Sequence, residues 1–197
     1  CFTATAKQDV RDEILDYFRA HLAQELALFE GGVERNNLQF EVQTIGSNEK
    51  YARIQQLLTE RLAETDGSAI VYCSTQKNTE DVAAFLSQQY WEAAAFHAGK
   101  DAAEKRHIQE SFIDGSIRVI AATNAFGMGI DKDNVRLVIH ADIPGSLENY
   151  LQEAGRAGRD REAAECVLLF DEHDIETQFK LSAASQIDQR DIAQILR

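Results

Sequence analysis

Two arginines three residues apart carry the strongest chemical signal in the chain. Arg156 and Arg159 stand in the run Tyr-Leu-Gln-Glu-Ala-Gly-Arg-Ala-Gly-Arg-Asp, residues 150–160. Gly155 and Gly158 let the backbone turn tightly while the arginines project from neighbouring turns. Because positions i and i+3 share a helical face, the two guanidinium groups are expected to converge on one polyanion. Two arginines in an arbitrary helix would more often be solvated surface groups, so the surrounding pattern decides the interpretation.

The segments that position these arginines alternate between short apolar runs and longer amphipathic ones. Six runs rich in β-branched, aromatic or small apolar residues predict strands at 38–45, 69–74, 93–97, 118–123, 135–141 and 166–171. Six segments, most of them apolar at steps of three and four, predict helices at 8–20, 49–65, 78–90, 101–113, 147–155 and from 174 to near the end. Nearly continuous apolar strands separated by helices predict an α/β sandwich with a mainly parallel sheet.

Polar segments follow four of the predicted strands. They come after Cys73, Phe96, Ala122 and Ala141. In parallel sheets the functional groups gather beyond the carboxyl ends of the strands, so we expect a site at that edge.

Composition excludes several classes of protein. Lys and Arg number 20 against 33 Asp and Glu, a net charge of −13, which argues against a histone-like polybasic binder. A protein whose nucleic-acid contacts come from a few local groups remains compatible with that charge. No apolar run approaches about 18 residues, so no membrane span is expected. Cys1, Cys73 and Cys166 are too far apart in sequence for zinc-ligand spacing, which predicts reduced thiols, no structural zinc and a cytoplasmic protein.

The arginine segment resembles motif VI of superfamily 2 helicases, in the form typical of the RecQ family. Five further segments match the family in order. Residues 2–6 (Phe-Thr-Ala-Thr-Ala) resemble motif III, and residues 35–38 (Arg-Asn-Asn-Leu) resemble the entry to the second lobe. Residues 70–75 (Ile-Val-Tyr-Cys-Ser-Thr) resemble motif IV, residues 96–99 (Phe-His-Ala-Gly) resemble the signature that follows it, and residues 120–132 resemble motif V. Six ordered matches are far more specific than any one of them.

The resemblance implies a RecA-like three-layer sandwich and a division of the chain. Residues 1–33 would end a first RecA-like lobe, 34–170 would form the second, and 171–197 would be a helical extension toward a further region. The implied protein is an ATP-dependent DNA helicase of repair and recombination, moving 3′ to 5′ on single-stranded or duplex DNA in a bacterial cytosol or nucleoid. Neither Gly-x-x-x-x-Gly-Lys-Ser/Thr nor Asp-Glu-x-His occurs in the chain. The phosphate cradle and the Mg²⁺ ligands would therefore lie in the first lobe, and this chain alone is expected to be inactive.

The resemblance also assigns roles around ATP. Arg159 would be the arginine finger that stabilises charge on the γ-phosphate in phosphoryl transfer, and Arg156 would contact that phosphate or bridge the lobes. Gln152 would connect the phosphate end with the nucleic acid. Gly127 and Gly129 would allow close backbone approach to the nucleotide, and Asp131 would accept hydrogen bonds from the ribose.

On the nucleic-acid side, the candidates are polar residues just past strand ends. They are Ser74, Thr75, Asn78, His97, Thr123 and Asn124. A helix N-terminus near the first three favours phosphate, although Ser and Thr there also serve as plain N-caps. His97 would contact the DNA backbone or organise its loop. Contacts of this kind carry little sequence information, so binding should be largely independent of base sequence.

Departures from the family pattern leave two alternatives open. Asn36, Lys100, Asp133 and Arg161 stand where Pro, Leu, Pro and Gly are common, and none of them removes a charged ATP ligand. A DEAD-box RNA helicase lobe shares the Gly-Arg-x-Gly-Arg core but would carry His-Arg where Gln152 and Glu153 stand. A non-catalytic adapter could keep the fold without the chemistry.

The predicted first helix, 8–20, carries an apolar stripe formed by Val10, Ile14, Leu15 and Phe18. Without the rest of the first lobe to pack on, this stripe needs another surface. We therefore expect it to pack imperfectly or to join two copies of the chain.

Overall fold

The computed structural model describes residues 8–28, 35–127 and 130–184. The chain divides into two compact units, Cys1–Arg35 and Asn36–Arg197. In the first unit the described element is α1 (Gln8–Leu22), whose Val10 and Tyr17 side chains are exposed. The motif III residues 2–6 lie outside the described residues. The assignment of 1–33 to a first lobe stays a prediction, as does dimerisation through this helix.

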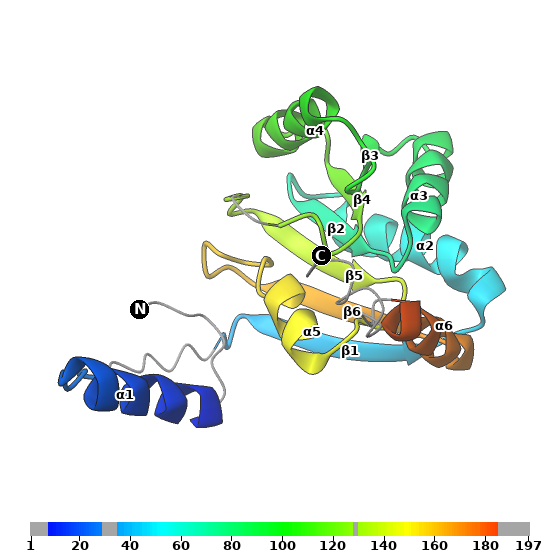
Figure 1. Cartoon of the computed structure of the whole chain (residues 1–197). Helices are drawn as coiled ribbons and strands as arrows, with labels where there is room; N and C mark the ends of the chain where they lie inside the picture. The colour runs from blue at the N-terminus through cyan, green and yellow to red at the C-terminus, as the bar shows by residue number, and fades with distance from the viewer. Residues whose placement is uncertain (1–7, 29–34, 128–129, 185–197) are drawn as a thin grey trace. The chain divides into compact units, whose positions relative to one another are not determined.

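The second unit is built on one six-stranded sheet in the order β1-β6-β5-β2-β4-β3 (Figure 1). Every strand pair in it is parallel, as the sequence predicts. The strands are β1 (Leu38–Thr44), β2 (Ser68–Tyr72), β3 (Ala93–Phe96), β4 (Val119–Ala122), β5 (Val135–His140) and β6 (Ala164–Phe170).

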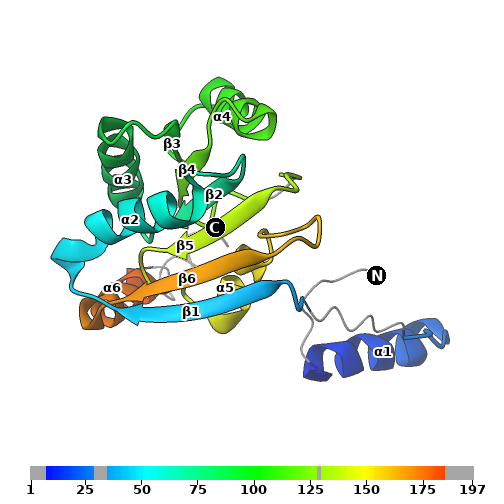
Figure 2. The ribbon, with the colours of Figure 1, turned by 180° about the vertical axis from the view of Figure 1, so that it is seen from behind.

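Helices cover both faces of the sheet, which makes the predicted three-layer sandwich. After the short turn η1 (Ser47–Glu49), they are α2 (Lys50–Leu62), α3 (Gln76–Gln88), α4 (Ala102–Asp114), α5 (Leu147–Ala154) and α6 (Glu172–Ala184). Helix α5 lies in front of the sheet in Figure 1, and α2 lies in front of it in the reverse view of Figure 2.

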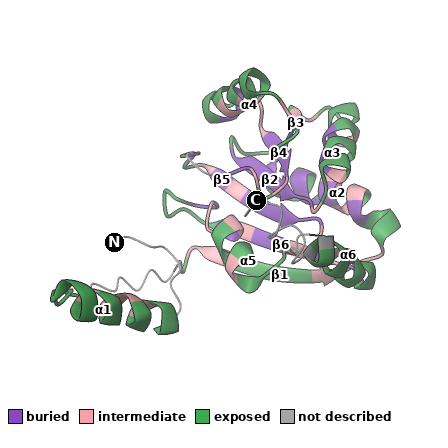
Figure 3. Cartoon of the chain, in the orientation of Figure 1, coloured by how far each residue is buried: buried purple, intermediate pink, exposed green. Residues whose placement is uncertain are grey.

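The core forms two clusters of buried residues, one on each side of the sheet. Figure 3 shows that the buried residues concentrate on the central strands. On one side, apolar residues of α2 and α3 such as Leu57 and Leu86 pack on alternate strand residues such as Val71. On the other side, Phe112 of α4 and Ala154 of α5 pack against the opposite strand face. Because the central strands are covered on both faces, their runs are apolar throughout, and β2 is buried along its whole length.

The helix ends differ from the predicted ones by a few residues, for local reasons. Helix α3 starts at Gln76 rather than 78 because Thr75 caps it, its side chain accepting from the Asn78 amide. Helix α2 ends at Leu62 rather than 65 because the Arg118 guanidinium donates hydrogen bonds to the carbonyl oxygens of Leu62 and Thr65, at 3.0 and 2.7 Å. Helix α4 ends at Asp114, one residue beyond its predicted end, and is capped by Gly115, whose φ of +90° favours glycine.

Helix α6 begins at Glu172, directly after the carboxyl end of β6, and Figure 1 shows it beside the strand ends. The extension predicted for 171–197 therefore begins as a helix next to the expected site. Residues 185–197 lie outside the described part.

Candidate functional site

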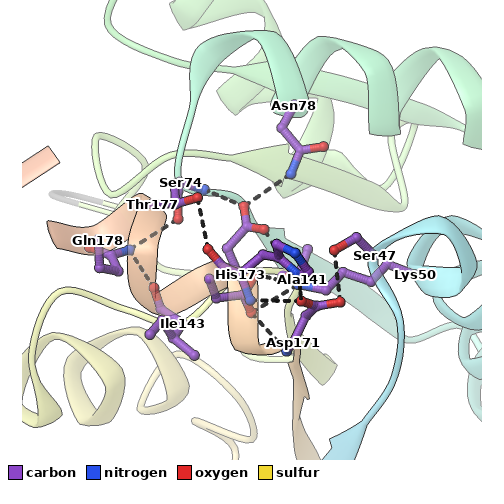
Figure 4. Close-up of polar contacts among 12 residues, drawn as sticks. Ser47, Lys50, Ser74, Asn78, Ala141, Ile143, Asp171, His173, Thr177 and Gln178 are labelled. Carbon is purple, nitrogen blue, oxygen red and sulfur yellow. Dashed lines mark hydrogen bonds and ion pairs between the residues drawn. The ribbon is translucent and has the colours of Figure 1, made fainter. Parts of the chain in front are cut away.

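The carboxyl edge of the sheet brings together Ser74 and Asn78, two of the predicted DNA contacts (Figure 4). Both donate to one carboxylate oxygen of Asp142, the Ser74 amide at 2.8 Å and the Asn78 side-chain nitrogen at 3.0 Å. Asn78 also accepts from the Tyr51 hydroxyl at 2.7 Å. The side-chain oxygen of Asn78 is therefore already engaged, whereas the hydroxyl hydrogen of Ser74 can still donate to an outside partner.

Thr75 takes the N-cap position of α3, the alternative that its sequence position left open. Its hydroxyl oxygen accepts from the Asn78 amide at 3.1 Å, and its side chain is exposed. The hydroxyl hydrogen can still donate, so a cap and a phosphate contact are compatible at this residue.

His97 lies at the end of β3 with both ring nitrogens engaged inside the lobe. Its Nδ1 accepts from the Gly99 amide at 3.2 Å, which leaves Nε2 to donate to Glu80 at 2.8 Å. This arrangement supports the loop-organising role considered for His97. The hydrogen bond from His97, and then that from Lys100, lowers the pKa of the Glu80 carboxyl. Lys100, at a position where Leu is common, thereby joins this network.

Thr123 and Asn124 follow β4, as predicted from the strand end. The Thr123 amide donates to the Phe96 carbonyl at 3.2 Å, which ties its loop to the neighbouring strand end. Thr123 is half-buried and Asn124 is exposed. Ser74 and Asn124 line the same cavity, of about 320 Å³, so candidates from two loops meet there.

The arginines lie elsewhere, on the α5 side of the sheet. Helix α5 ends at Ala154, so Arg156 and Arg159 stand in the turns after it, and the argument from a shared helical face is wrong. The turn is fixed at the opposite edge, where the Gly158 amide donates to the carbonyl of Val135, the first residue of β5. Gly158 has φ +54°, a conformation that favours glycine.

What brings the two arginines together is the segment matched to motif V. Arg156 donates to the Gly127 carbonyl at 2.5 Å, and Arg159 pairs with Asp131 at the same distance. A Cβ at Gly127 would lie 1.9 Å from the Arg156 guanidinium, so this glycine makes room for the arginine. Gln152 is exposed on α5, and Gly129 lies outside the described residues.

Two observations test whether this loop fits a nucleotide phosphate. The Arg156 Nε atom is buried and has no hydrogen-bond partner, so the guanidinium has unused donor capacity. The side chains of the Arg159–Asp131 pair are 33% and 84% exposed. An exposed pair of this kind contributes at most about 1 kcal/mol, so an incoming phosphate can replace Asp131 at little cost. These features fit the arginine half of a phosphate site.

Sequence analysis missed a buried charge network that supports the carboxyl edge. Lys50 donates to Asp174 at 2.7 Å and to the Ala141 carbonyl at 2.6 Å, and its Nζ lies 3.6 Å from Asp142. The Lys50 and Asp174 side chains are 6% and 7% exposed. Of the residues in this network, the sequence pointed only to Asp142, because Asp142 follows a predicted strand end. Lysine at the start of an amphipathic helix normally faces water, so Lys50 gave none.

Near the start of α6, Asp171 accepts from the Ser47 hydroxyl at 2.8 Å and from the His173 ring at 2.7 Å. The hydrogen bond from the His173 amide, followed by those from the Ser47 hydroxyl and the His173 ring, lowers the pKa of Asp171. The same ring contact raises the pKa of His173. This second set of contacts holds α6 against the turn that precedes α2.

Within the described residues, no three His, Cys, Asp or Glu side chains gather in a way that could hold a metal ion. The absence of structural zinc stays a prediction, which elemental analysis of the purified chain would test. Over the same part of the chain, no helix is long and apolar enough to cross a membrane.

Comparison with known proteins agrees with this geometry. Residues 49–161 match the family model described as helicase conserved C-terminal domain. The fold is that of a RecA-like helicase lobe, and the chain belongs to this family. Its relatives place it with the RecQ-type members.

ATP-dependent DNA helicase RecQ of Haemophilus influenzae is 38% identical over 87% of this chain and 26% of its own length. ATP-dependent DNA helicase RecQ of Bacillus subtilis is 38% identical over 95% of the chain and 30% of its own length. RecQ-like DNA helicase BLM of Xenopus laevis is 36% identical over 88% of the chain. The chain thus spans less than a third of these relatives.

The backbone at Arg161 shows why glycine is common at this position in the family. Arg161 stands where Gly is common and has φ +69°, in the left-handed region. The glycine usual at this position suits a backbone that an arginine adopts only with strain.

Proposed function

We propose that this chain is the second motor lobe of an ATP-dependent DNA helicase that moves 3′ to 5′ in DNA repair and recombination. The observation that carries the proposal is the contact of both motif VI arginines with the motif V segment, at Gly127 and Asp131. The relatives named as ATP-dependent DNA helicases supply the reaction class. ATP with Mg²⁺ is the proposed fuel, and the metal ligands belong to the first lobe.

In this proposal Arg159 is the arginine finger. When the lobes close on ATP, its guanidinium leaves the exposed Asp131 carboxylate and contacts the γ-phosphate, where it stabilises charge that develops in the transition state. Arg156, held by the Gly127 carbonyl, stays in place beside it and donates from the guanidinium hydrogens that this contact leaves free. Asp131, once released, is free to accept from the ribose hydroxyls. Gln152 would connect this end with the DNA.

The carboxyl edge is the proposed single-strand surface. Ser74, Thr75, Thr123 and Asn124 present hydroxyl and amide donors to backbone phosphates, and the acidic remainder of the chain limits unspecific binding. His97 acts by holding its loop.

The experiment that tests the proposal is steady-state ATP hydrolysis by the full-length protein that carries this chain, with DNA present. Arg159→Ala should lower kcat by about 10³-fold or more with little change in ATP affinity, since the finger acts on transition-state charge. Arg159→Lys should restore little, because an ammonium lacks the forked donors. Arg106→Ala, which removes an exposed arginine of α4, is the matched control. An unchanged kcat in Arg159→Ala, or DNA-stimulated hydrolysis by the isolated chain, would contradict the proposal.

A further inference from the structure

Helix α6 makes a polar contact with the proposed DNA surface through Gln178. Its Nε2 donates to the Ser74 hydroxyl oxygen at 3.1 Å and also to the Ile143 carbonyl (Figure 4). Gln178 and Ser74 both line the cavity of about 320 Å³ that Asn124 shares. A residue from the predicted extension thus contacts a predicted DNA-binding residue.

The orientation of the Gln178 amide follows from its partners. The Ile143 carbonyl can only accept, so the side-chain nitrogen, and not the oxygen, must face it. The second hydrogen of the same nitrogen then points to Ser74, whose hydroxyl oxygen has to act as the acceptor. A flipped amide would set two oxygens against each other at Ile143.

This arrangement decides what Ser74 can offer. Its backbone amide is taken by Asp142, and its hydroxyl oxygen is taken by Gln178. Among the contacts of the described residues, none gives the hydroxyl hydrogen an acceptor. A DNA phosphate oxygen is an acceptor without a hydrogen of its own, so it matches the one donor that Ser74 has left.

The buried ion pair fixes the position of Gln178. Asp174 is bound to Lys50 at 2.7 Å. Gln178 lies four residues further along α6, so both side chains project from the same face of the helix. The anchored first turn of α6 thereby delivers the amide to the strand end.

We propose that Gln178 is a positioning residue, which orients the Ser74 hydroxyl as a donor to a phosphate of single-stranded DNA. The inference rests on the proposed function for the identity of the ligand. It adds that α6 is part of the DNA surface.

The test is an NMR titration of the 197-residue chain with single-stranded oligothymidylate, which measures weak affinities from shifts of the backbone amide at position 74. Gln178→Glu is nearly isosteric, but its carboxylate only accepts, so it loses the bond to the Ile143 carbonyl and draws the Ser74 hydrogen inward. Ser74→Ala removes the donor, and the double variant completes the cycle. Gln88→Glu, at the far end of α3, adds the same charge away from the site. Thermal unfolding of every variant checks that the fold is kept.

Ser74→Ala and Gln178→Glu should each weaken DNA binding by about three- to tenfold, the size expected for one hydrogen bond to a charged group at a solvated site. The double variant should bind within about twofold of Ser74→Ala, since the donor is already gone. Gln88→Glu should bind like the unaltered chain. Below neutral pH, as the introduced carboxyl approaches its usual pKa of about 4.3, Gln178→Glu should regain affinity while Ser74→Ala does not.

Two results would overturn the inference alone. One is Gln178→Glu binding as tightly as the unaltered chain while Ser74→Ala is impaired. The other is a loss of equal size from Gln178→Glu in the Ser74→Ala background, which would mean that the substitution acts through its charge. If the unaltered chain binds no DNA, the proposed DNA surface is wrong and the inference falls with it.

Discussion

Removing one partner of the buried Lys50–Asp174 pair should destabilise the lobe severely. Asp174→Leu leaves the Lys50 ammonium, 6% exposed, with the Ala141 carbonyl at 2.6 Å and the Asp142 carboxylate at 3.6 Å. Breaking a buried pair in this way typically costs about 3–5 kcal/mol. Because Asp142 still offers partial compensation, we expect about 3 kcal/mol here.

Urea unfolding measures the loss, with the fluorescence of the single tryptophan, Trp91, as the probe. Trp91 packs against the α2–α3 core layer and so reports on the lobe itself. With a slope of about 2 kcal/mol per molar urea, the midpoint should fall by about 1.5 M. The exposed Lys77–Asp81 pair, 3.5 Å apart, gives the control: Lys77→Met should cost less than about 0.5 kcal/mol.

The double variant Lys50→Met/Asp174→Leu separates the unpaired charge from lost packing. It removes both charges, and we expect it to recover at least half of the loss, since a buried pair replaced by apolar groups is often near neutral. A loss below about 1 kcal/mol in Asp174→Leu, or a double variant no more stable than the single one, would refute the reasoning.

Three further substitutions test other parts of the structure. Arg161→Gly should raise the free energy of unfolding by about 0.5–1 kcal/mol, because it relieves a positive φ at an exposed residue, and unchanged urea midpoints would contradict this. Gly127→Ala should displace the Arg156 guanidinium and lower ATP turnover of the full-length protein by more than about tenfold; normal turnover would show that the contact is dispensable. His173→Ala should cost more stability at pH 5.5 than at pH 8.5. Asp171 raises the pKa of His173, so the stabilisation from their contact is full below the usual pKa of about 6.5 and is lost as the pH rises through the folded-state pKa. If the urea midpoints of the variant and the unaltered chain differ equally at both pH values, this prediction is wrong.

The sequence was sufficient to predict the sheet because its strands are apolar throughout and its helices are periodic. The predicted strand ends also located Ser74 and Asn124, since the chain leaves a parallel strand at a known edge. Helical spacing could not predict the contact between Arg156 and Gly127. Helix α5 ends at Ala154, and a loop far away in the sequence supplies the partner of Arg156.

The supporting residues were hidden for a different reason. Gln178 and Lys50 are polar residues on amphipathic helices, where the usual expectation is contact with water. Their roles depend on where α6 docks. Lys50 of α2 sets that position by donating to Asp174 of α6 and to the carbonyl of Ala141, which follows β5. No local pattern in the sequence specifies such a docking position.

The central claim, that Arg159 acts on the γ-phosphate in the transition state, is tested most directly by nucleotide binding to the full-length protein. ADP with aluminium fluoride imitates the transferring phosphoryl group, whereas ADP alone does not. We predict that Arg159→Ala binds ADP as tightly as the unaltered protein and loses about 10²-fold or more in affinity for the ADP–aluminium fluoride complex. Equal affinity of both proteins for that complex would contradict the assignment.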